Sequence, residues 1–198
     1  MTRLVLASKS AARAAMLRGA GLTIDLAAAP VDERALDEAW TREGRDPAAV
    51  ARGLGEAKAL AVSRTDPEAT VIGADQTLAL GTRRFSKPAS LAEARDNLLA
   101  LRGQSHHLHS GVALARGGAI VFSTVASAAM TMRPFSEDFL DAYLTGAGER
   151  VLASVGCYQL ESDGIQLFER ISGDYFTILG MPLLPLLAAL RAQGVIAT

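Results

Sequence analysis

Residues 3–13 read RLVLASKSAAR and place a short apolar run directly before a polar turn and the start of a helix. The apolar residues 3–7 predict a buried strand. Ser10 is a favourable N-cap for a helix over residues 11–18, which Gly19 would end. A strand that leads directly into a helix at the beginning of the chain is typical of α/β proteins.

The elements that follow continue this alternation and then change to longer strands. The order predicts one α/β domain over residues 1–198 with a mixed, curved central sheet flanked by helices, because hairpins follow the early strand–helix units. No internal repeat or long linker interrupts the pattern. The expected strands cover residues 23–28, 70–74, 78–85 (as a hairpin), 106–115, 119–132, 155–160, 165–171 and 175–179, and the expected helices cover residues 46–63, 90–103, 136–145 and 182–192.

Composition excludes several classes of protein. The chain has 198 residues, 49% of them hydrophobic, and a net charge of -1. The near-zero charge argues against a protein that coats nucleic acid, and no apolar run reaches the ~18 residues of a membrane-spanning helix. The N-terminus makes a poor signal peptide. The single Cys157 allows no internal disulfide and no cysteine-based zinc site, and it suits a cytoplasmic location.

The turn between the first strand and the first helix is a candidate anion site. A helix N-terminus presents unpaired N–H groups and the positive end of the helix dipole. Ser8 and Ser10 add hydroxyl groups, and Arg13 would lie in the first turn of the helix. The alternative is a capped surface helix whose cations are solvated.

Two carboxylates and two lysines form the next candidates. Asp75 follows the buried run TVIGA, and Glu33 lies in the loop expected over residues 30–34. Together they could share Mg²⁺ or Mn²⁺, which prefer oxygen ligands, although most such acids are solvated surface charges. Of 20 basic residues only three are lysine. Lys9, Lys58 and Lys87 are therefore positions where a compact cation could be needed.

Two further groups favour ordinary structural roles. His106, His107 and His109 lie so close together that they suggest a metal site, but only alternate residues of a strand share a face. We favour a half-exposed strand there. Cys157 has no nucleophile signature around it.

Seven short motifs occur in an order and spacing that resemble one known family. They are residues 6–13 (LASKSAAR), 31–33 (VDE), the helix that carries Lys58, residues 71–75 (VIGAD), 87–88 (KP), 110–112 (SGV) and 180–183 (GMPL). This pattern resembles the Maf family of nucleoside triphosphate pyrophosphatases from about Arg3 to Leu190. Ala11 and Ser86 depart from it, where the family has a proline and a glycine.

The resemblance implies a cytoplasmic enzyme of inosine-triphosphatase-like architecture, with a cleft between two lobes. It would hydrolyse a nucleoside triphosphate to a monophosphate and pyrophosphate. Asp75 would be the general base and, with Glu33, would bind a divalent cation, Mg²⁺ or Mn²⁺. The substrate would be bound by Ser8, Arg13, Lys58, Lys87, Gln76 and Glu161. A homodimer is plausible, and neither a nucleic acid polymer nor a membrane is an expected partner.

Substrate choice in the resembled family depends on three positions, here Ala12, Gln76 and Glu161. Gln76 and Glu161 match the subfamily that hydrolyses 7-methyl-GTP, whereas Ala12 stands where that subfamily has tryptophan. We therefore expect 7-methyl-GTP as the favoured substrate. The alternatives are a broad-range or dTTP/UTP-type pyrophosphatase and a nucleotide-binding regulator of septum formation.

Overall fold

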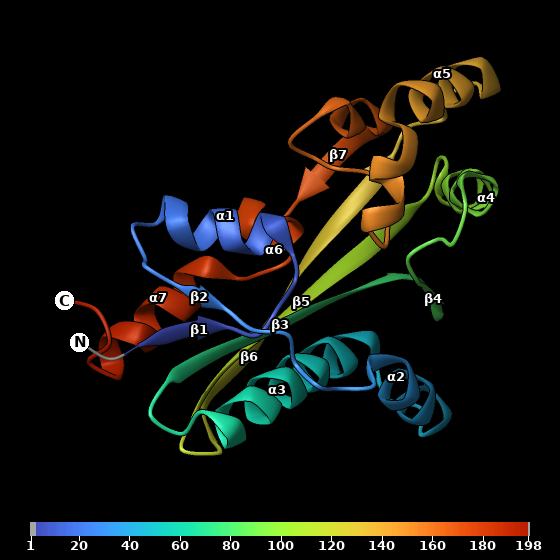
Figure 1. Ribbon diagram of the computed structural model, residues 1–198. Helices are drawn as coiled ribbons and strands as arrows, with labels where there is room; N and C mark the ends of the chain where they lie inside the picture. Colours follow the sequence, from blue (N-terminus) through green and yellow to red (C-terminus); the bar gives the residue numbers. More distant parts are fainter. Residues whose placement is uncertain (1–2, 198) are drawn as a thin grey trace. The chain divides into compact units, whose positions relative to one another are not determined.

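The computed structural model describes residues 3–197, which form two compact units (Figure 1). The first unit comprises the chain up to Gln76, residues His109–Ala126, and the chain from Tyr175 onward. The second unit comprises Thr77–Leu108 and Ser127–Asp174. Neither unit is continuous in sequence, because three long strands each contribute residues to both.

The first unit holds the N-terminal and C-terminal helices. In chain order its own elements are β1 (Leu4–Leu6), α1 (Ala11–Gly19), β2 (Asp25–Leu26), α2 (Glu33–Arg42), α3 (Pro47–Thr65), α6 (Tyr175–Ile178) and α7 (Leu183–Ala192). The three shared strands are β3 (Thr70–Leu80), β5 (Ser105–Arg116) and β6 (Ala119–Met132). The second unit adds β4 (Arg83–Phe85), α4 (Leu91–Leu101), α5 (Glu137–Ala147), the 3-10 helices Gly148–Ala153 and Asp163–Leu167, and β7 (Phe168–Ser172).

The described strands form a mixed sheet in the order β2-β1-β3-β5-β6-β7, with β4 paired to β3. β1 runs parallel to β2 and to β3, and its Leu6 lies opposite Ile72 of β3. β4 and β7 pair antiparallel with β3 and β6. The structure therefore confirms the predicted mixed α/β architecture.

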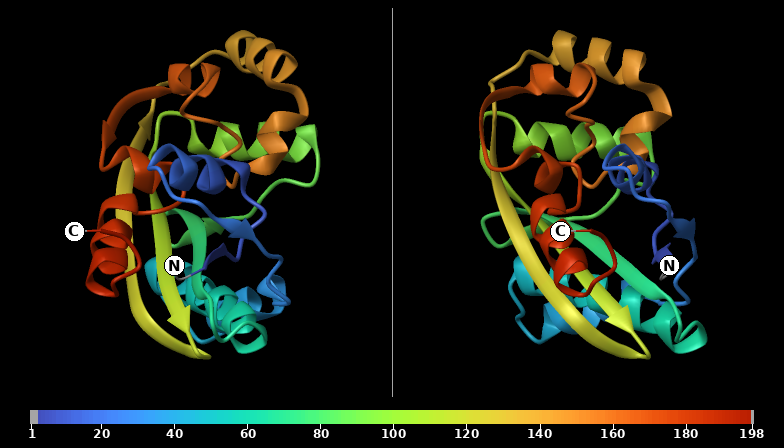
Figure 2. Two further views of the ribbon diagram at one scale, coloured as in Figure 1. Left: turned by 60° about the vertical axis from the view of Figure 1, so that its left-hand side comes forward. Right: turned by 90° about the vertical axis from the view of Figure 1, so that its left-hand side faces the viewer.

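Alternating side chains place the helices of the first unit on opposite faces of its strands (Figure 1). Leu4 and Leu6 of β1 pack with α1 and α7, whereas Val5 and Ala7 pack with α3. Figure 2 shows α7 alongside the first half of β6, whose Phe122 packs against the same cluster. On β3, Ile72 belongs to the first face and Val71 to the second. Because of this alternation, successive side chains further along β3 point to opposite faces of the sheet.

Local signals predicted most helices, but two helices were not predicted. Ser10, Asp46 and Ser90 cap α1, α3 and α4 as expected. The loop expected over residues 30–34 instead contains the start of α2, with Asp32 as its N-cap. The strand expected over 175–179 is the short helix α6, and residues 155–160 form turns and irregular backbone.

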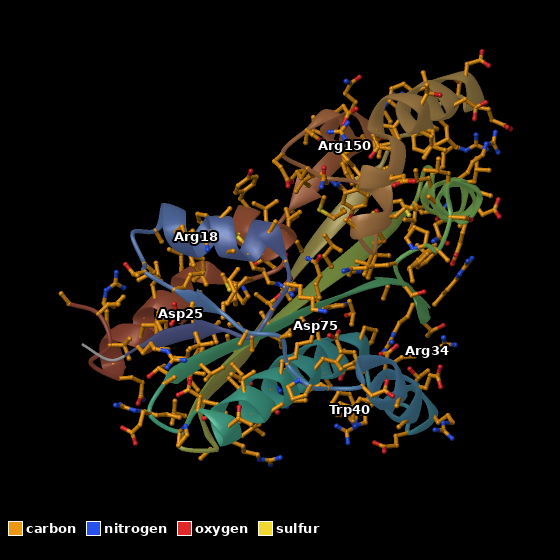
Figure 3. All side chains as sticks on the ribbon, viewed as in Figure 1. Arg18, Asp25, Arg34, Trp40, Asp75 and Arg150 are labelled. Carbon is orange, nitrogen blue, oxygen red and sulfur yellow. The ribbon has the colours of Figure 1, made fainter. Side chains whose placement is uncertain are left out.

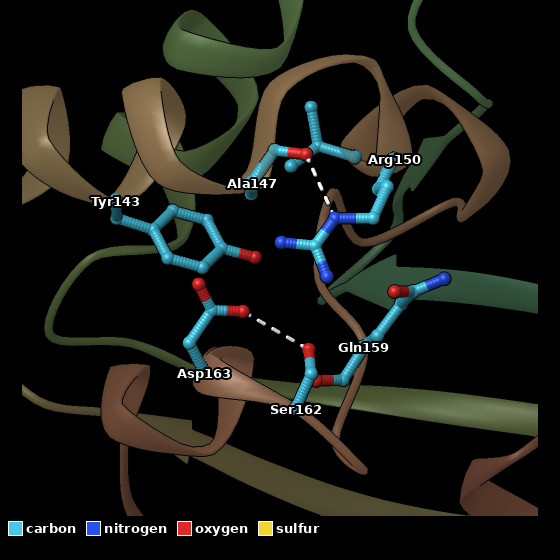
Figure 4. Close-up of a pocket in the computed structure, with 7 residues that line it drawn as sticks. Tyr143, Ala147, Arg150, Gln159, Ser162 and Asp163 are labelled. Carbon is cyan, nitrogen blue, oxygen red and sulfur yellow. Dashed lines mark hydrogen bonds between the residues drawn. The ribbon is translucent and has the colours of Figure 1, made fainter.

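The second unit contains one small surface hollow. Tyr143, Arg150 and Asp163 line it, and Figure 4 shows the hydrogen bond from Arg150 to the carbonyl of Ala147. Arg150 also donates to the carbonyl of Gly146, so its guanidinium is held at the end of α5. Within residues 3–197, no helix is long and apolar enough to cross a membrane.

Candidate active site

The candidate site lies where β1 ends and leaves one edge of β3 uncovered. The last ladder contact is the hydrogen bond from Ala7 N to Ile72 O, at 2.8 Å. Two residues further along β3, the carbonyl of Ala74 is instead bound by the Nη1 of Arg13, at 3.0 Å. Asp75 is the next residue, and Figure 3 shows it beyond the end of β1, where the chain turns toward α1. β3 itself continues to Leu80, so Asp75 does not end its strand as the apolar run suggested.

The polar turn of residues 8–10 has a defined hydrogen-bond pattern. Ser10 caps α1 through its Oγ, which accepts from the backbone N–H of Arg13 at 3.4 Å. The Oγ of Ser8 accepts from the backbone N–H of Ser10 at 3.2 Å and from Arg13 Nη1 at 3.3 Å. A serine hydroxyl offers two acceptor positions and one donor. Ser8 therefore keeps its O–H available as a donor toward a ligand.

Arg13 is a buried cation without an acidic partner. Only 9% of the residue is exposed, and its Nε donates to the carbonyl of Gly180 at 2.9 Å. Among residues 3–197, no carboxylate lies within ion-pair distance of its guanidinium. Burial lowers the pKa of Arg13, and the charges of Asp75 and Glu33 oppose that shift. A buried charge held only by neutral groups is costly, so an anion at the free Nη2 would relieve that cost.

Lys58 joins the two predicted acidic residues. Its Nζ lies 2.6 Å from Asp75 Oδ1 and 2.8 Å from Glu33 Oε2. The Lys58 side chain is 7% exposed, whereas that of Glu33 is 52% exposed. Asp75 points toward α3, the face that also receives Val71, because residues two apart on a strand share a face. The structure thus brings Glu33, Lys58 and Asp75 together.

Glycines allow α3 to approach the strands closely enough for this contact. A Cβ on Gly73 would lie 2.1 Å from the carbonyl oxygen of Gly55, and one on Gly111 would lie 2.4 Å from that of Ala51. Both contacts are far below any normal separation, and both involve backbone atoms of α3. The glycines of VIGAD and SGV therefore set the distance between Lys58 and Asp75.

The two carboxylates suit a divalent cation that also binds phosphate. Glu33 and Asp75 converge on one nitrogen, and each uses one oxygen there. Mg²⁺ commonly takes only one or two carboxylates and completes its octahedron with water and substrate phosphates. Among the described residues, no group of three or more His, Cys, Asp or Glu side chains is arranged to hold a metal ion. A shared metal–phosphate site therefore fits this chain better than an all-protein cage.

The residues predicted to set specificity, together with Lys87, fall in different parts of the structure. Gln76 points to the face opposite Asp75, where its amide contacts Ser110 and α6. Ala12 lies half-buried in the first turn of α1. Lys87 and Glu161 are exposed residues of the second unit. Sequence reasoning gave Ser110 no role of its own, although its place in the SGV motif was a usable signal.

His106 and Cys157 are buried groups of the second unit. His106 is fully buried, and its Nε2 is 2.8 Å from the hydroxyl of Tyr158. Cys157 is also buried, and burial raises the pKa of its thiol to about 11. A thiol of that acidity is a poor nucleophile at neutral pH.

Comparison with known proteins links this geometry to one family. The Maf-like protein family matches residues 3–193. A 7-methyl-GTP pyrophosphatase of Rhizobium meliloti (strain 1021) is 51% identical, covering 98% of this chain and 97% of that protein. A nucleoside triphosphate pyrophosphatase of Bradyrhizobium diazoefficiens is 53% identical, covering 98% and 95%. Among solved structures, a HAM1 protein from Coxiella burnetii matches at 17% identity with a TM-score of 0.39, covering 68% of this chain and 75% of that one.

Proposed function

The chain belongs to the Maf family, and on that premise we propose that it is a nucleoside triphosphate pyrophosphatase. It hydrolyses the bond between the α and β phosphates and releases a nucleoside monophosphate and pyrophosphate. The names of the relatives support this reaction.

The buried, unpaired guanidinium of Arg13 is the observation that carries the proposal. The planar guanidinium is held by hydrogen bonds to the carbonyls of Ala74 and Gly180, so Nη2 has a defined position before any ligand binds. The Ser8 hydroxyl, bound to the same guanidinium, adds a donor. Arginine and serine donors of this kind bind phosphate oxygens with charge-assisted hydrogen bonds. The substrate phosphates therefore bind at the end of β1.

We propose that Asp75 acts as the general base. Its Oδ1 is held by Lys58, which fixes the carboxylate in one orientation. Among the described residues, Oδ2 makes no hydrogen bond, so it is available to take a proton from a water molecule directed at the α phosphorus. Lys58 and Arg13 then stabilise the negative charge that develops on the departing pyrophosphate.

We propose that Glu33 and Asp75 hold a divalent cation together with the substrate phosphates. When bound, such a cation neutralises phosphate charge and orients the triphosphate. Lys58 must then share the two carboxylates with the metal. Glu33 can offer its second oxygen, and Asp75 can offer the remaining lone pair of Oδ1, which leaves Oδ2 for the water. Mg²⁺ and Mn²⁺ both suit these oxygen ligands.

The favoured substrate is 7-methyl-GTP, with a broader range of nucleoside triphosphates as the second candidate. Gln76 and Glu161 support the first, and the 53% identical relative with the general name supports the second. We propose that Lys87 contacts phosphate and that Glu161 reads the base. Glu161→Gln should reduce the preference for 7-methyl-GTP over GTP, because a neutral amide attracts a cationic base less strongly than a carboxylate.

A pyrophosphate-release assay tests the proposal. The substrates are 7-methyl-GTP, GTP, dTTP, UTP, CTP and ITP, each with Mg²⁺ or Mn²⁺. Asp75→Asn should lower kcat by about 10²–10⁴-fold while nucleotide binding persists. Asp25→Asn is the matched control, since Asp25 lies on β2 with a side chain that is 61% exposed (Figure 3). Release of orthophosphate in place of pyrophosphate, or full activity of Asp75→Asn, would contradict the proposal.

A further inference from the structure

The side-chain amide of Gln76 uses all its donors inside the protein. Its Nε2 lies 3.0 Å from Ser110 Oγ, 3.2 Å from the carbonyl of Thr177 and 3.0 Å from that of Ile178. The two carbonyls can only accept hydrogen bonds, so the NH₂ end of the amide must face them. The amide therefore has one favourable orientation, because the reversed orientation would place Oε1 against the carbonyl oxygens of Thr177 and Ile178.

Ser110 completes this arrangement. Its Oγ donates to the carbonyl of Thr177 at 2.7 Å, which leaves only its lone pairs for Gln76. Ser110 and Thr177 are buried, with exposed fractions of 0% and 1%. A wrongly oriented Gln76 would leave buried polar groups unsatisfied, at a cost of about 1–3 kcal/mol each. Ser110 therefore fixes which end of the Gln76 amide faces outward.

The oxygen of Gln76 remains available. Within residues 3–197, Oε1 accepts no hydrogen bond, and Gln76 is partly exposed. Gln76 directly follows Asp75 on the edge of β3 that β1 leaves uncovered, and Arg13 binds the carbonyl of Ala74 on the same edge. A ligand held by Arg13 thus meets Gln76 as a hydrogen-bond acceptor only.

We propose that Ser110 is a positioning residue for specificity, which makes Gln76 an acceptor that selects a nucleobase with N–H donors on its pairing edge. Guanine fits, because N1–H and the 2-amino group are adjacent donors. This inference rests on the proposed function and specifies the substrate class of the same site. It also gives the buried serine of the SGV motif a task separate from catalysis.

GTP, ITP and 1-methyl-GTP test whether Gln76 Oε1 accepts hydrogen bonds from the base. ITP lacks the 2-amino group of GTP, and 1-methyl-GTP lacks N1–H. We expect wild-type kcat/KM to fall at least about tenfold for one of these analogues relative to GTP, as hydrogen-bonding sites reject analogues that lack the donor. Ser110→Ala should reduce that discrimination severalfold, and Ser110→Thr, which keeps the hydroxyl, should retain it. Ser123→Ala is the matched control, because Ser123 bonds Glu56 away from Gln76.

Two results would overturn the inference. One is equal use of all three nucleotides by the wild type, and the other is an equal loss for all three in Ser110→Ala, which would mark a merely structural role. Affinities measured by calorimetry report the discrimination in binding without turnover, so an inactive protein would refute the proposed reaction and still test the inference. The side-chain amide protons of Gln76 should also exchange slowly with water by NMR, and faster in Ser110→Ala. Equal, fast exchange in both proteins would refute the fixed amide directly.

Discussion

At the scale of single residues, Arg13 has a geometry that another cation cannot reproduce. Its Nε and Nη1 donate to Gly180 O, Ala74 O and Ser8 Oγ. A lysine has one ammonium on a flexible stem and cannot reach all three acceptors. Arg13→Lys should therefore leave a buried carbonyl unpaired and lower the free energy of unfolding by about 1–3 kcal/mol.

The same variant should lose its response to pyrophosphate. A ligand that binds only the folded state raises the melting temperature, and we expect pyrophosphate to do so for the wild type and not for Arg13→Lys. Arg18→Lys is the control, since Arg18 is exposed at the other end of α1 (Figure 3). Equal stabilisation of all three proteins would show that Arg13 does not bind the anion.

His106 makes stability depend on pH. Burial lowers the pKa of His106 to about 4 in the folded protein, and the nearby His107 adds to this shift. The unfolded chain, with an ordinary pKa of about 6.5, takes up the proton first. Stability should therefore be fully present above pH 6.5 and fall as the pH drops toward 4, by an amount on the order of 3 kcal/mol.

Denaturant titrations between pH 4 and pH 7 measure this effect. His106→Gln should flatten the dependence in that window, because glutamine does not titrate. His107→Gln is the control and should keep most of the pH dependence of stability. A wild-type stability that stays constant from pH 6.5 to pH 4 would contradict the assignment to His106.

At the scale of elements, α2 contacts α3 through Trp40 and through the ion pair of Glu33 with Lys58. None of the residues of α2 is buried, and a Cβ on Gly53 of α3 would lie 2.9 Å from the ring of Trp40. Gly53→Ala should displace Trp40 and with it α2, whose first residue is Glu33. We expect kcat/KM to fall by about tenfold, since small displacements of a site residue are costly.

Trp40 is the only tryptophan of the chain, so its fluorescence reports the displacement. Gly146→Ala is a matched control, because Gly146 also lies in a helix and its Cβ would meet only an ordinary contact at 3.9 Å. That variant should keep its fluorescence and gain some helix stability. Unchanged emission and activity in Gly53→Ala would show that α2 does not position Glu33.

The same elements show what sequence could predict. Helix caps are local signals, so α1, α3 and α4 were predicted from Ser10, Asp46 and Ser90. α2 was missed although Leu36, Ala39 and Trp40 follow the i, i+3, i+4 spacing of a helix, so the sequence held a usable signal for it. α6 was missed because YFTIL favours a strand locally, whereas Gln76 binds the helical carbonyls of residues 177 and 178. The contact of Lys58 with Asp75 depends on the close approach of α3, which no local pattern encodes.

At the scale of the whole molecule, β3, β5 and β6 belong to both compact units. Each of these strands crosses from one unit into the other without a linker. If one unit unfolded, it would break hydrogen bonds of β3, β5 and β6, which are also strands of the other unit. The chain should therefore behave as one cooperative domain, as the uninterrupted sequence pattern predicted.

Two single residues allow this prediction to be tested unit by unit. Trp40 lies in the first unit, and Cys157, the only cysteine, is buried in the second. In a denaturant titration, Trp40 fluorescence, Cys157 reactivity toward a thiol reagent, and circular dichroism should share one midpoint. Pyrophosphate, which we propose binds Arg13 of the first unit and Lys87 of the second, should shift all three equally, because a ligand stabilises the whole of a two-state protein. A contrary result would be that Cys157 becomes reactive at a lower denaturant concentration than the other two signals change, or that its midpoint does not respond to pyrophosphate. Either result would mean that the second unit unfolds by itself.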